Sequence, residues 1–160
     1  MKLSTKGRYG LRAVVDIAHH CTSEPASLSS IAARQKLSEG YLEQIIAKLK
    51  KAGIVLSARG SGGGYRLAKA PEDITVGDVL RALEGDLTVC ECQERKDICG
   101  LFDQCVTKYV WERINNSINH VVDTMTIREV ISFGEQNRKE DEFNEQNDLY
   151  GSRCDDSGAT

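Results

Sequence analysis

Apolar residues recur at three- and four-residue intervals through the first third of the chain, which is the spacing of an amphipathic helix. The pattern predicts a first helix over residues 6–20 and a short second helix capped by Ser27 or Ser29. A third helix is predicted to begin after Ser38 and to end at Gly53. Two short helices joined by a tight turn, the second with a polar and basic outer face, indicate a helix-turn-helix.

Two strand-like runs then flank a glycine-rich turn within residues 54–67. This pattern is typical of a β-hairpin, which would form the wing of a winged helix-turn-helix. A phosphate-binding loop is the alternative interpretation. However, the segment lacks Gly-Lys-Ser/Thr, and Tyr65 stands where a Gly-x-Gly-x-x-Gly match beginning at Gly60 needs its last glycine. The pattern therefore favours the hairpin.

Further helices are predicted after the hairpin. One opens at the capping sequence that starts with Thr75 and ends near Gly85. From about Val106, an apolar stripe predicts a helix of about twenty residues, roughly 30 Å long. A capping box at Thr126 starts a last short helix that runs to about Phe133. The expected fold class is mainly α with a small β-hairpin, namely a winged helix-turn-helix domain plus a long dimerisation helix.

So long a helix beside a small domain needs a surface that covers its apolar stripe. We expect the same helix of a second subunit, because two-fold dimers are the commonest oligomers and helix-turn-helix dimers match palindromic sites. The alternative is that the helix folds back on its own domain. The expected organisation is a winged helix-turn-helix domain over 1–86, a cysteine-rich cluster-binding loop over 87–105, the dimerisation helix and terminal short helix over 106–133, and an acidic, disordered tail over 134–160.

Charge is divided unevenly along the chain, although the net charge is only -3. Residues 1–70 contain twelve Lys and Arg against four Asp and Glu, whereas residues 71–160 contain nine against twenty. A basic half indicates a polyanion partner, here double-stranded DNA. No apolar run reaches the roughly 18 residues of a membrane span, and no signal-peptide core is present. A cytoplasmic protein is therefore expected, with no membrane partner and no small-molecule substrate.

Four of the six cysteines fall between Cys90 and Cys105. A reducing cytoplasm makes structural disulfides unfavourable and leaves metal, redox or buried-thiol roles. The wide spacing of Cys92, Cys99 and Cys105 suits an iron-sulfur cluster wrapped by a flexible loop. Structural zinc more often uses Cys-x2-Cys knuckles, which the stretch lacks. Zinc and free sensing thiols are the alternatives.

Four stretches match a known family in the same order, namely Lys2–Gly10, Leu37–Gln44, Arg59–Tyr65 and Val76–Gly85. On these residues the chain, from 1 to about 133, resembles a family of winged-helix transcription regulators. That family includes the iron-sulfur cluster regulator IscR, the nitric-oxide sensor NsrR and the cysteine-metabolism repressor CymR. The resemblance implies a homodimer with crossed long helices and a recognition helix in the major groove of each half of a palindromic operator.

The resemblance also implies which residues contact DNA. Arg59 and Gly60 of the wing would reach the minor groove, where a narrow groove favours Arg. The recognition helix and its start would contact bases or flanking phosphates, since Gln can pair with adenine and Glu with cytosine. The predicted residues there are Ser38, Tyr41, Glu43 and Gln44. The remaining predicted contacts are Lys48, Lys2 and Thr5.

Cluster-binding relatives place three cysteines immediately before the long helix, which implies iron coordination by Cys92, Cys99 and Cys105. A 2Fe-2S cluster is favoured over 4Fe-4S. IscR-like members have a histidine three residues after the last cysteine, where this chain has Lys108. Cys90 is the simplest replacement as the fourth ligand. A residue from the partner subunit's N-terminal region is an alternative, although the acidic residue of NsrR-like proteins is replaced here by Arg at position 8.

Histidines are a further source of the fourth ligand, namely His19, His20 and His120. A histidine on a helix is more often a packed or exposed side chain than a ligand. Cys154, in the acidic tail, is expected to be an incidental thiol.

The predicted function is a DNA-binding repressor that senses iron-sulfur status, redox state or nitric oxide through the bound cluster. The alternative is a CymR-like repressor of cysteine metabolism that uses free thiols or a protein partner. An enzyme is not expected, because the chain lacks a recognisable catalytic constellation. A protein-interaction module built on the long helix would leave the basic half unexplained.

Overall fold

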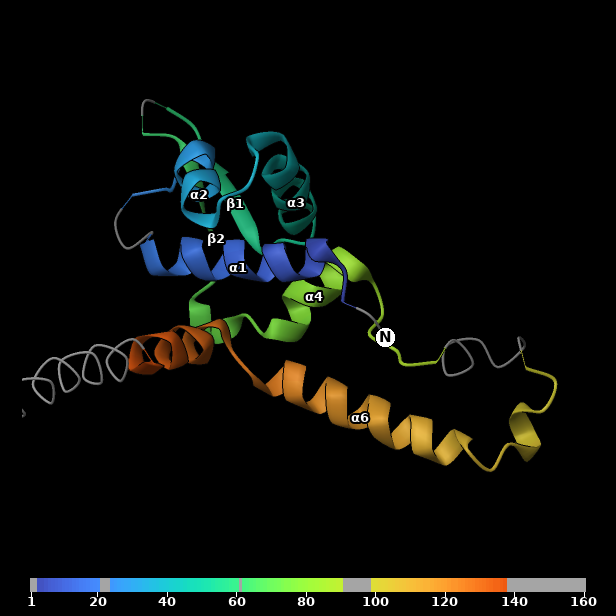
Figure 1. The fold of residues 1–160 in the computed structure, drawn as a ribbon. Coiled ribbons are helices and arrows are strands. Elements are labelled where there is room, and N and C mark those ends of the chain that lie inside the picture. The colour runs from blue at the N-terminus through green and yellow to red at the C-terminus, as the bar shows by residue number, and fades with distance from the viewer. Residues whose placement is uncertain (1–2, 21–23, 61, 91–98, 138–160) are drawn as a thin grey trace, which may run out of the picture.

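The computed structural model describes residues 3–20, 24–60, 62–90 and 99–137. Its elements along the chain are α1 (Thr5–His20), α2 (Leu28–Gln35), α3 (Glu39–Lys51), β1 (Val55–Ala58), β2 (Gly64–Leu67), η1 (Pro71–Asp73), α4 (Val76–Glu84), η3 (Phe102–Gln104) and α6 (Lys108–Thr124). Residues 127–137 are also helical. Figure 1 shows α1, α2, α3 and the hairpin gathered in one body, with α6 along its lower side. The fold is mainly α with a small β-hairpin, as predicted.

The helix-turn-helix is formed by α2 and α3, and local hydrogen bonds fix where each helix starts. The Ser27 hydroxyl accepts a hydrogen bond from a backbone amide one turn later, so Ser27 rather than Ser29 caps α2. The Ser38 hydroxyl accepts a hydrogen bond from the Tyr41 amide at 3.4 Å and caps α3, as predicted. Between the helices, Lys36 adopts the left-handed conformation with a φ of 55°. This residue turns the chain from α2 into α3.

The wing is an antiparallel hairpin of β1 and β2, in which Val55 pairs with Leu67. At its tip, Gly60 has a φ of 117°, a conformation that residues with a side chain rarely adopt. The carbonyl of Gly60 accepts a hydrogen bond from the Gly63 amide at 2.9 Å. The glycine-rich sequence therefore forms a tight turn between two strands, as predicted.

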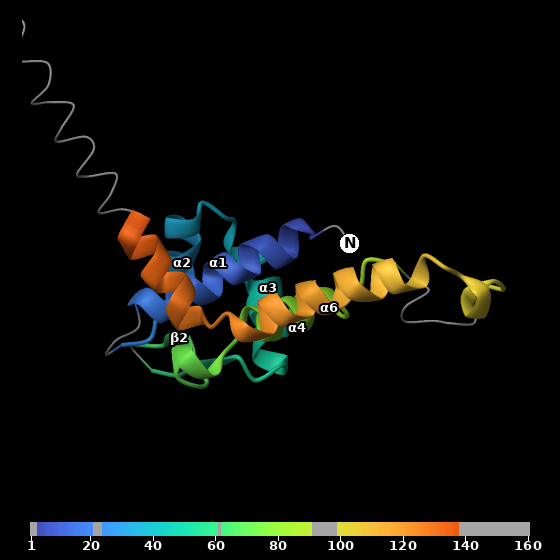
Figure 2. The ribbon, with the colours of Figure 1, turned by 90° about the horizontal axis from the view of Figure 1, so that it is seen from below.

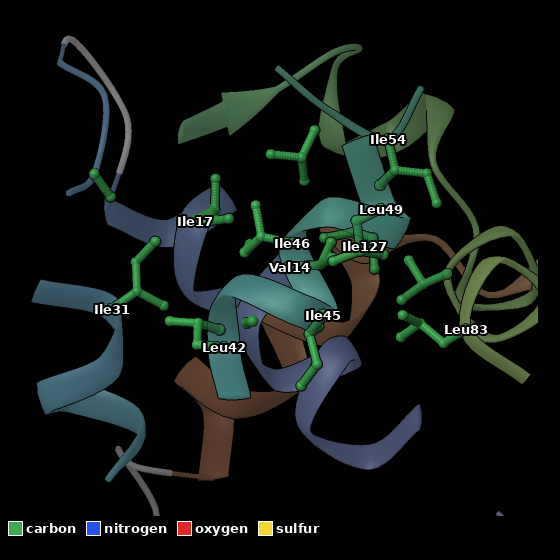
Figure 3. Close-up of a cluster of buried hydrophobic side chains, with 14 of the residues drawn as sticks. Val14, Ile17, Ile31, Leu42, Ile45, Ile46, Leu49, Ile54, Leu83 and Ile127 are labelled. Carbon is green, nitrogen blue, oxygen red and sulfur yellow. The ribbon is translucent and has the colours of Figure 1, made fainter. Parts of the chain in front are cut away.

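The apolar faces predicted for the first and third helices meet in one core, shown in Figure 3. Its fully buried side chains include Val14, Ile17, Ile31, Leu42, Ile45, Ile46 and Leu49. Ile127 is also fully buried there, and Ile131 is 7% exposed. Burying each such aliphatic side chain stabilises the fold by roughly 1.5–3 kcal/mol. The core thus includes residues that follow α6 and extends beyond the domain limit expected at residue 86.

The helix that begins after Thr126 is longer than expected. The Glu129 carboxylate accepts a hydrogen bond from the Thr126 amide at 2.7 Å, and the Thr126 hydroxyl accepts one from the Glu129 amide at 3.2 Å. This is the predicted capping box. The helix passes the expected end near Phe133, so residues 134–137 of the predicted tail are helical. Burial of Ile127 and Ile131 anchors its first turns. The tail beyond residue 137 lies outside the described residues.

The C-terminal half of α6 packs against α4 (Figure 2). Arg81 of α4 donates hydrogen bonds to Asp123 at 2.5 and 3.0 Å and to Asn119 at 2.5 Å. The apolar stripe is only partly covered, since Val110 is 52% and Val121 53% exposed. Folding back on its own domain therefore covers part of α6 and leaves an apolar face open. Nowhere in the described ranges is a helix long and apolar enough to span a membrane.

Candidate nucleic-acid interface and cysteine loop

The outer face of α3 is polar and basic, opposite the buried stripe. Three of the predicted DNA-contacting residues, Glu43, Gln44 and Lys48, are exposed on this face, and Ser38 is exposed at its start. Tyr41 differs, because it is half-buried and packs against the core. Its ring also meets the Tyr9 ring edge-on, with centroids 6.2 Å apart.

The start of α3 and the hairpin tip lie on the same side of the domain, opposite α6 (Figure 1). Arg59 and Gly60 are exposed at this tip. Thr5 is exposed at the first turn of α1, while Lys2 lies outside the described residues. The fold therefore presents the described DNA-contacting candidates at the surface, with Tyr41 only partly so.

A pair of lysines from two helices forms a local concentration of positive charge beside the recognition helix. The side chain of Lys6, from α1, contacts that of Lys48, from α3, and this contact lowers the pKa of Lys48. The charge of Lys6 and the loss of hydration also lower the pKa of Lys48, whereas the charge of Glu84 raises it. The Lys48 ammonium donates a hydrogen bond to the Leu83 carbonyl at 3.5 Å. The contact of Lys6 with Lys48 could not be predicted from the sequence, because the spacing of Lys6 on α1 gives no sign of it.

The described cysteines of the loop are Cys90, Cys99 and Cys105, and each is a half-buried free thiol. Cys92 lies outside the described residues. Within the described ranges, no three Cys, His, Asp or Glu side chains lie close enough together to hold a metal ion. The iron ligands inferred from the sequence, with Cys90 as the fourth, therefore remain a prediction.

Cys105 has the surroundings of a metal-binding or reactive thiol. Its Sγ lies 3.2 Å from the Thr107 hydroxyl, just before α6. This hydrogen bond lowers the pKa of the Cys105 thiol, and burial opposes it. The backbone amides of Thr107 and Lys108 and the charge of Lys108 lower the pKa further. The net shift favours the thiolate, which is the form that binds metals, so Cys105 is suited to be a cluster ligand.

Lys108 stands at the position where the resemblance to IscR-like proteins implies a histidine. Its ammonium donates a hydrogen bond to the Asp103 carbonyl at 3.1 Å. It also lies 5.6 Å from the centre of the Phe102 ring and 5.4 Å from that of Tyr109. The ammonium group that makes these contacts has no lone pair to bind a metal.

Two of the candidate histidines lie far from the cysteine loop within one chain. His19 Nε2 is 3.7 Å from the Glu135 carboxylate, and His20 Nδ1 is 3.0 Å from the Asp16 carbonyl. Both are at the C-terminal end of α1, at the opposite end of the molecule from η3 (Figure 1). His120 is exposed on α6. The fold therefore does not bring His19 or His20 to the described cysteines of the same chain.

Comparison with known families identifies the family to which this fold belongs. The model of the Rrf2 family, described as iron-dependent transcriptional regulators, matches residues 3–132. The chain belongs to the Rrf2 family. This Rrf2 chain is 39% identical over 135 residues to the HTH-type transcriptional regulator IscR of Vibrio atlanticus, covering 84% of the chain and 78% of that relative.

Solved Rrf2-type structures agree with the fold. The structure of CymR, the global cysteine regulator of B. subtilis, has a TM-score of 0.72 at 39% identity, covering 83% of this chain and 98% of that one. The structure of T. potens IscR has a TM-score of 0.70 at 47% identity, covering 86% and 90%. These similarities confirm the winged-helix fold and place the Rrf2 chain among transcriptional regulators rather than enzymes. Relatives named IscR and CymR match it to a similar degree.

Proposed function

We propose that this Rrf2 protein is a homodimeric repressor in the cytoplasm that senses iron-sulfur status, redox state or nitric oxide through an iron-sulfur cluster in the cysteine loop. The main support is Cys105, a half-buried free thiol whose Sγ lies 3.2 Å from the Thr107 hydroxyl, immediately before the helix expected to form the dimer. The 47% identity to T. potens IscR supports the same assignment.

In this proposal α3 enters the major groove of each half-site. Ser38, Glu43 and Gln44 contact bases or flanking phosphates, and the partly buried Tyr41 contributes through its exposed edge. The other proposed DNA contacts are Lys48, Thr5, Lys2, Arg59 and Gly60. A palindromic operator follows from the proposed two-fold dimer. A binding titration at several salt concentrations tests this part, because phosphate contacts make the affinity fall steeply with salt.

The dimer contact is assigned to the open face of α6. Tyr109 is 66% exposed, Val110 52% and Ile114 37%. A second copy of α6 would remove these side chains from water, which supports the helix as the dimer interface.

The cluster ligands in this proposal are Cys92, Cys99 and Cys105, with Cys90 as the fourth and 2Fe-2S favoured over 4Fe-4S. When bound, such a cluster supplies a centre that changes with oxidation state or reaction with nitric oxide. Thr107 and the first amides of α6 stabilise the Cys105 thiolate. The cluster would act by biasing the loop and α6 toward one of two arrangements.

Anaerobic purification followed by absorption spectra and iron and sulfide assays tests the cluster. Cys99→Ala should remove the visible absorption and change promoter affinity, whereas the matched control Cys154→Ala should retain both. A colourless wild-type protein loaded with zinc would refute the proposed mechanism. Full colour in Cys99→Ala would refute this ligand alone.

A CymR-like repressor of cysteine metabolism is the second candidate function. Lys108 favours it, because a lysine stands in place of the histidine of IscR-like proteins and its ammonium donates a hydrogen bond to the Asp103 carbonyl. In this case the free thiols or a protein partner would control DNA binding. In that case DNA binding by the cluster-free protein would still be fully regulated. Reduction or alkylation of its thiols would alter its affinity for DNA.

A further inference from the structure

The last turn of α4 is in direct contact with the first turn of α1. The Glu84 carboxylate accepts a hydrogen bond from the Gly7 amide at 2.8 Å and another from the Ser4 hydroxyl at 2.5 Å. The first amides of a helix have no partners within that helix, and they favour a negative charge. Glu84 therefore fixes the start of α1 from another part of the chain.

Two glycines allow α1 to approach α4 this closely. A methyl group at Gly7 would overlap the Glu84 carboxylate, and one at Gly10 would overlap the Leu83 side chain and crowd Ile45. Figure 3 shows Leu83 and Ile45 among the buried side chains of the core. The position of α1 thus depends directly on the last turn of α4, because the side chains of Glu84 and Leu83 pack against the α1 backbone at these two glycines.

The same turn also contacts the recognition helix. The Leu83 carbonyl accepts the hydrogen bond from Lys48, whose side chain contacts Lys6 from the first turn of α1. Leu83 and Glu84 therefore lie beneath a basic surface that two helices build together. A phosphate group of DNA is the anion that such a pair of lysines suits.

The chain leads from this turn straight into the cysteine loop. Residues 85–89 connect α4 to Cys90, and within them the Val89 amide donates a hydrogen bond to the Asn115 side chain of α6 at 2.8 Å. Asn115 is 7% exposed, so this bond is shielded from water. Glu84 is thus followed along the chain by the residues that lead into the cysteine loop, and its side chain contacts the start of α1 at the proposed DNA-binding surface.

We propose that Glu84 is a positioning residue for DNA binding, which holds the start of α1 so that Lys6 and Lys48 meet the same stretch of DNA backbone. This role rests on the proposed function. A positioning role and charge repulsion predict opposite changes in DNA affinity when Glu84 is removed. An acid beside a basic DNA-binding surface repels phosphate, so its removal should strengthen binding if charge alone mattered. If Glu84 positions α1, its removal weakens binding.

The test measures the affinity of full-length, cluster-free protein for a duplex that the wild-type protein selects from a random-sequence pool. Glu84→Ala should bind at least fivefold more weakly than wild type. Glu84→Gln removes the charge but keeps an oxygen acceptor, and should bind as tightly as wild type or more tightly. Glu72→Ala is the matched control, because Glu72 is exposed on η1 and its ion pair with Arg128 spans 3.8 Å. It should bind within twofold of wild type.

Gly7→Ala is a second variant that leaves every charge in place. Its methyl group should displace the Glu84 carboxylate, and binding should fall as in Glu84→Ala. Wild-type-like binding by both Glu84→Ala and Gly7→Ala, or tighter binding by Glu84→Ala, would overturn the role of Glu84. A wild-type protein that selects no duplex would instead refute the proposed function, and this role with it.

Discussion

A buried ion pair between α1 and α2 allows a quantitative test of how the helix-turn-helix is held to the core. Arg34 donates hydrogen bonds of 2.7–3.1 Å to both carboxylate oxygens of Asp16, and Gln35 donates another at 3.0 Å. The Asp16 side chain is only 4% exposed. Arg34→Ala would leave this carboxylate with Gln35 as its remaining strong partner.

The expected cost follows from the exposure of the two partners. Removing one member of a buried ion pair costs about 3–5 kcal/mol. The Arg34 side chain is 33% exposed, and Gln35 still donates to Asp16, so water and the amide recover part of this loss. We expect Arg34→Ala to lower the free energy of unfolding by about 2 kcal/mol. Urea unfolding followed by circular dichroism, at one fixed protein concentration, measures it.

Arg128→Ala is the control, since Arg128 and Glu72 are 3.8 Å apart with side chains 58% and 59% exposed. Its cost should stay below about 0.5 kcal/mol. If Arg34→Ala were no more destabilising than Arg128→Ala, the buried pair would not secure α2 to α1.

The same pair predicts a pH dependence. Burial raises the pKa of Asp16, but hydrogen bonds from Arg34 and Gln35 and the charge of Arg34 outweigh it, so the net pKa is below the ordinary value. A carboxyl group with a lowered folded-state pKa stabilises the fold fully above its ordinary pKa, and this contribution disappears as pH falls through the folded-state value. The difference in stability between wild type and Arg34→Ala should therefore shrink in acid. A difference that stays constant into strong acid would contradict the assignment to Asp16.

Two further predictions concern the proposed surfaces. Arg59→Ala should weaken specific DNA binding by about 1–3 kcal/mol without changing thermal stability, measured by fluorescence anisotropy, whereas Arg66→Ala, farther from the hairpin tip, should bind normally. Equal DNA affinities of Arg59→Ala and wild type would exclude Arg59 from the DNA interface. Ile114→Asp places a charge on the open face of α6 and should convert the dimer to monomer in sedimentation velocity. Asn116→Asp adds the same charge off the stripe and should remain dimeric, and a dimeric Ile114→Asp would exclude this face.

The helices and the hairpin could be predicted because each has a local sequence signal. The stripe of Leu42, Ile45 and Leu49 shows helical spacing whatever it packs against, and Ser38 reports a helix start one turn ahead. The glycines of the wing indicate a turn for the same reason. These features depend on residues only a few positions apart.

Contacts between distant residues had no such signal. Glu84 binds the Gly7 amide across most of the winged domain, and the meeting of Lys6 with Lys48 depends on how α1 crosses α3. The capping box at Thr126 predicted a helix but not that Ile127 would enter the core. Tyr41 was assigned to the DNA surface by resemblance, yet its packing against Tyr9 and the core leaves it half-buried.

The burial of Ile127, which follows α6, in the core limits how α6 can move when the cysteine loop changes. Ile127 anchors the C-terminal end of α6 to the core, while the end next to Cys105 extends beyond the domain. With 17 residues, α6 is about 25 Å long. Because Asp123 and Asn119 also hold the C-terminal half of α6 to Arg81 of α4, a tilt of α6 would move mainly its end next to Cys105. In a two-fold dimer, each cysteine loop would adjoin the end of α6 that moves most. The angle between the two α6 helices would then set the distance between the two recognition helices.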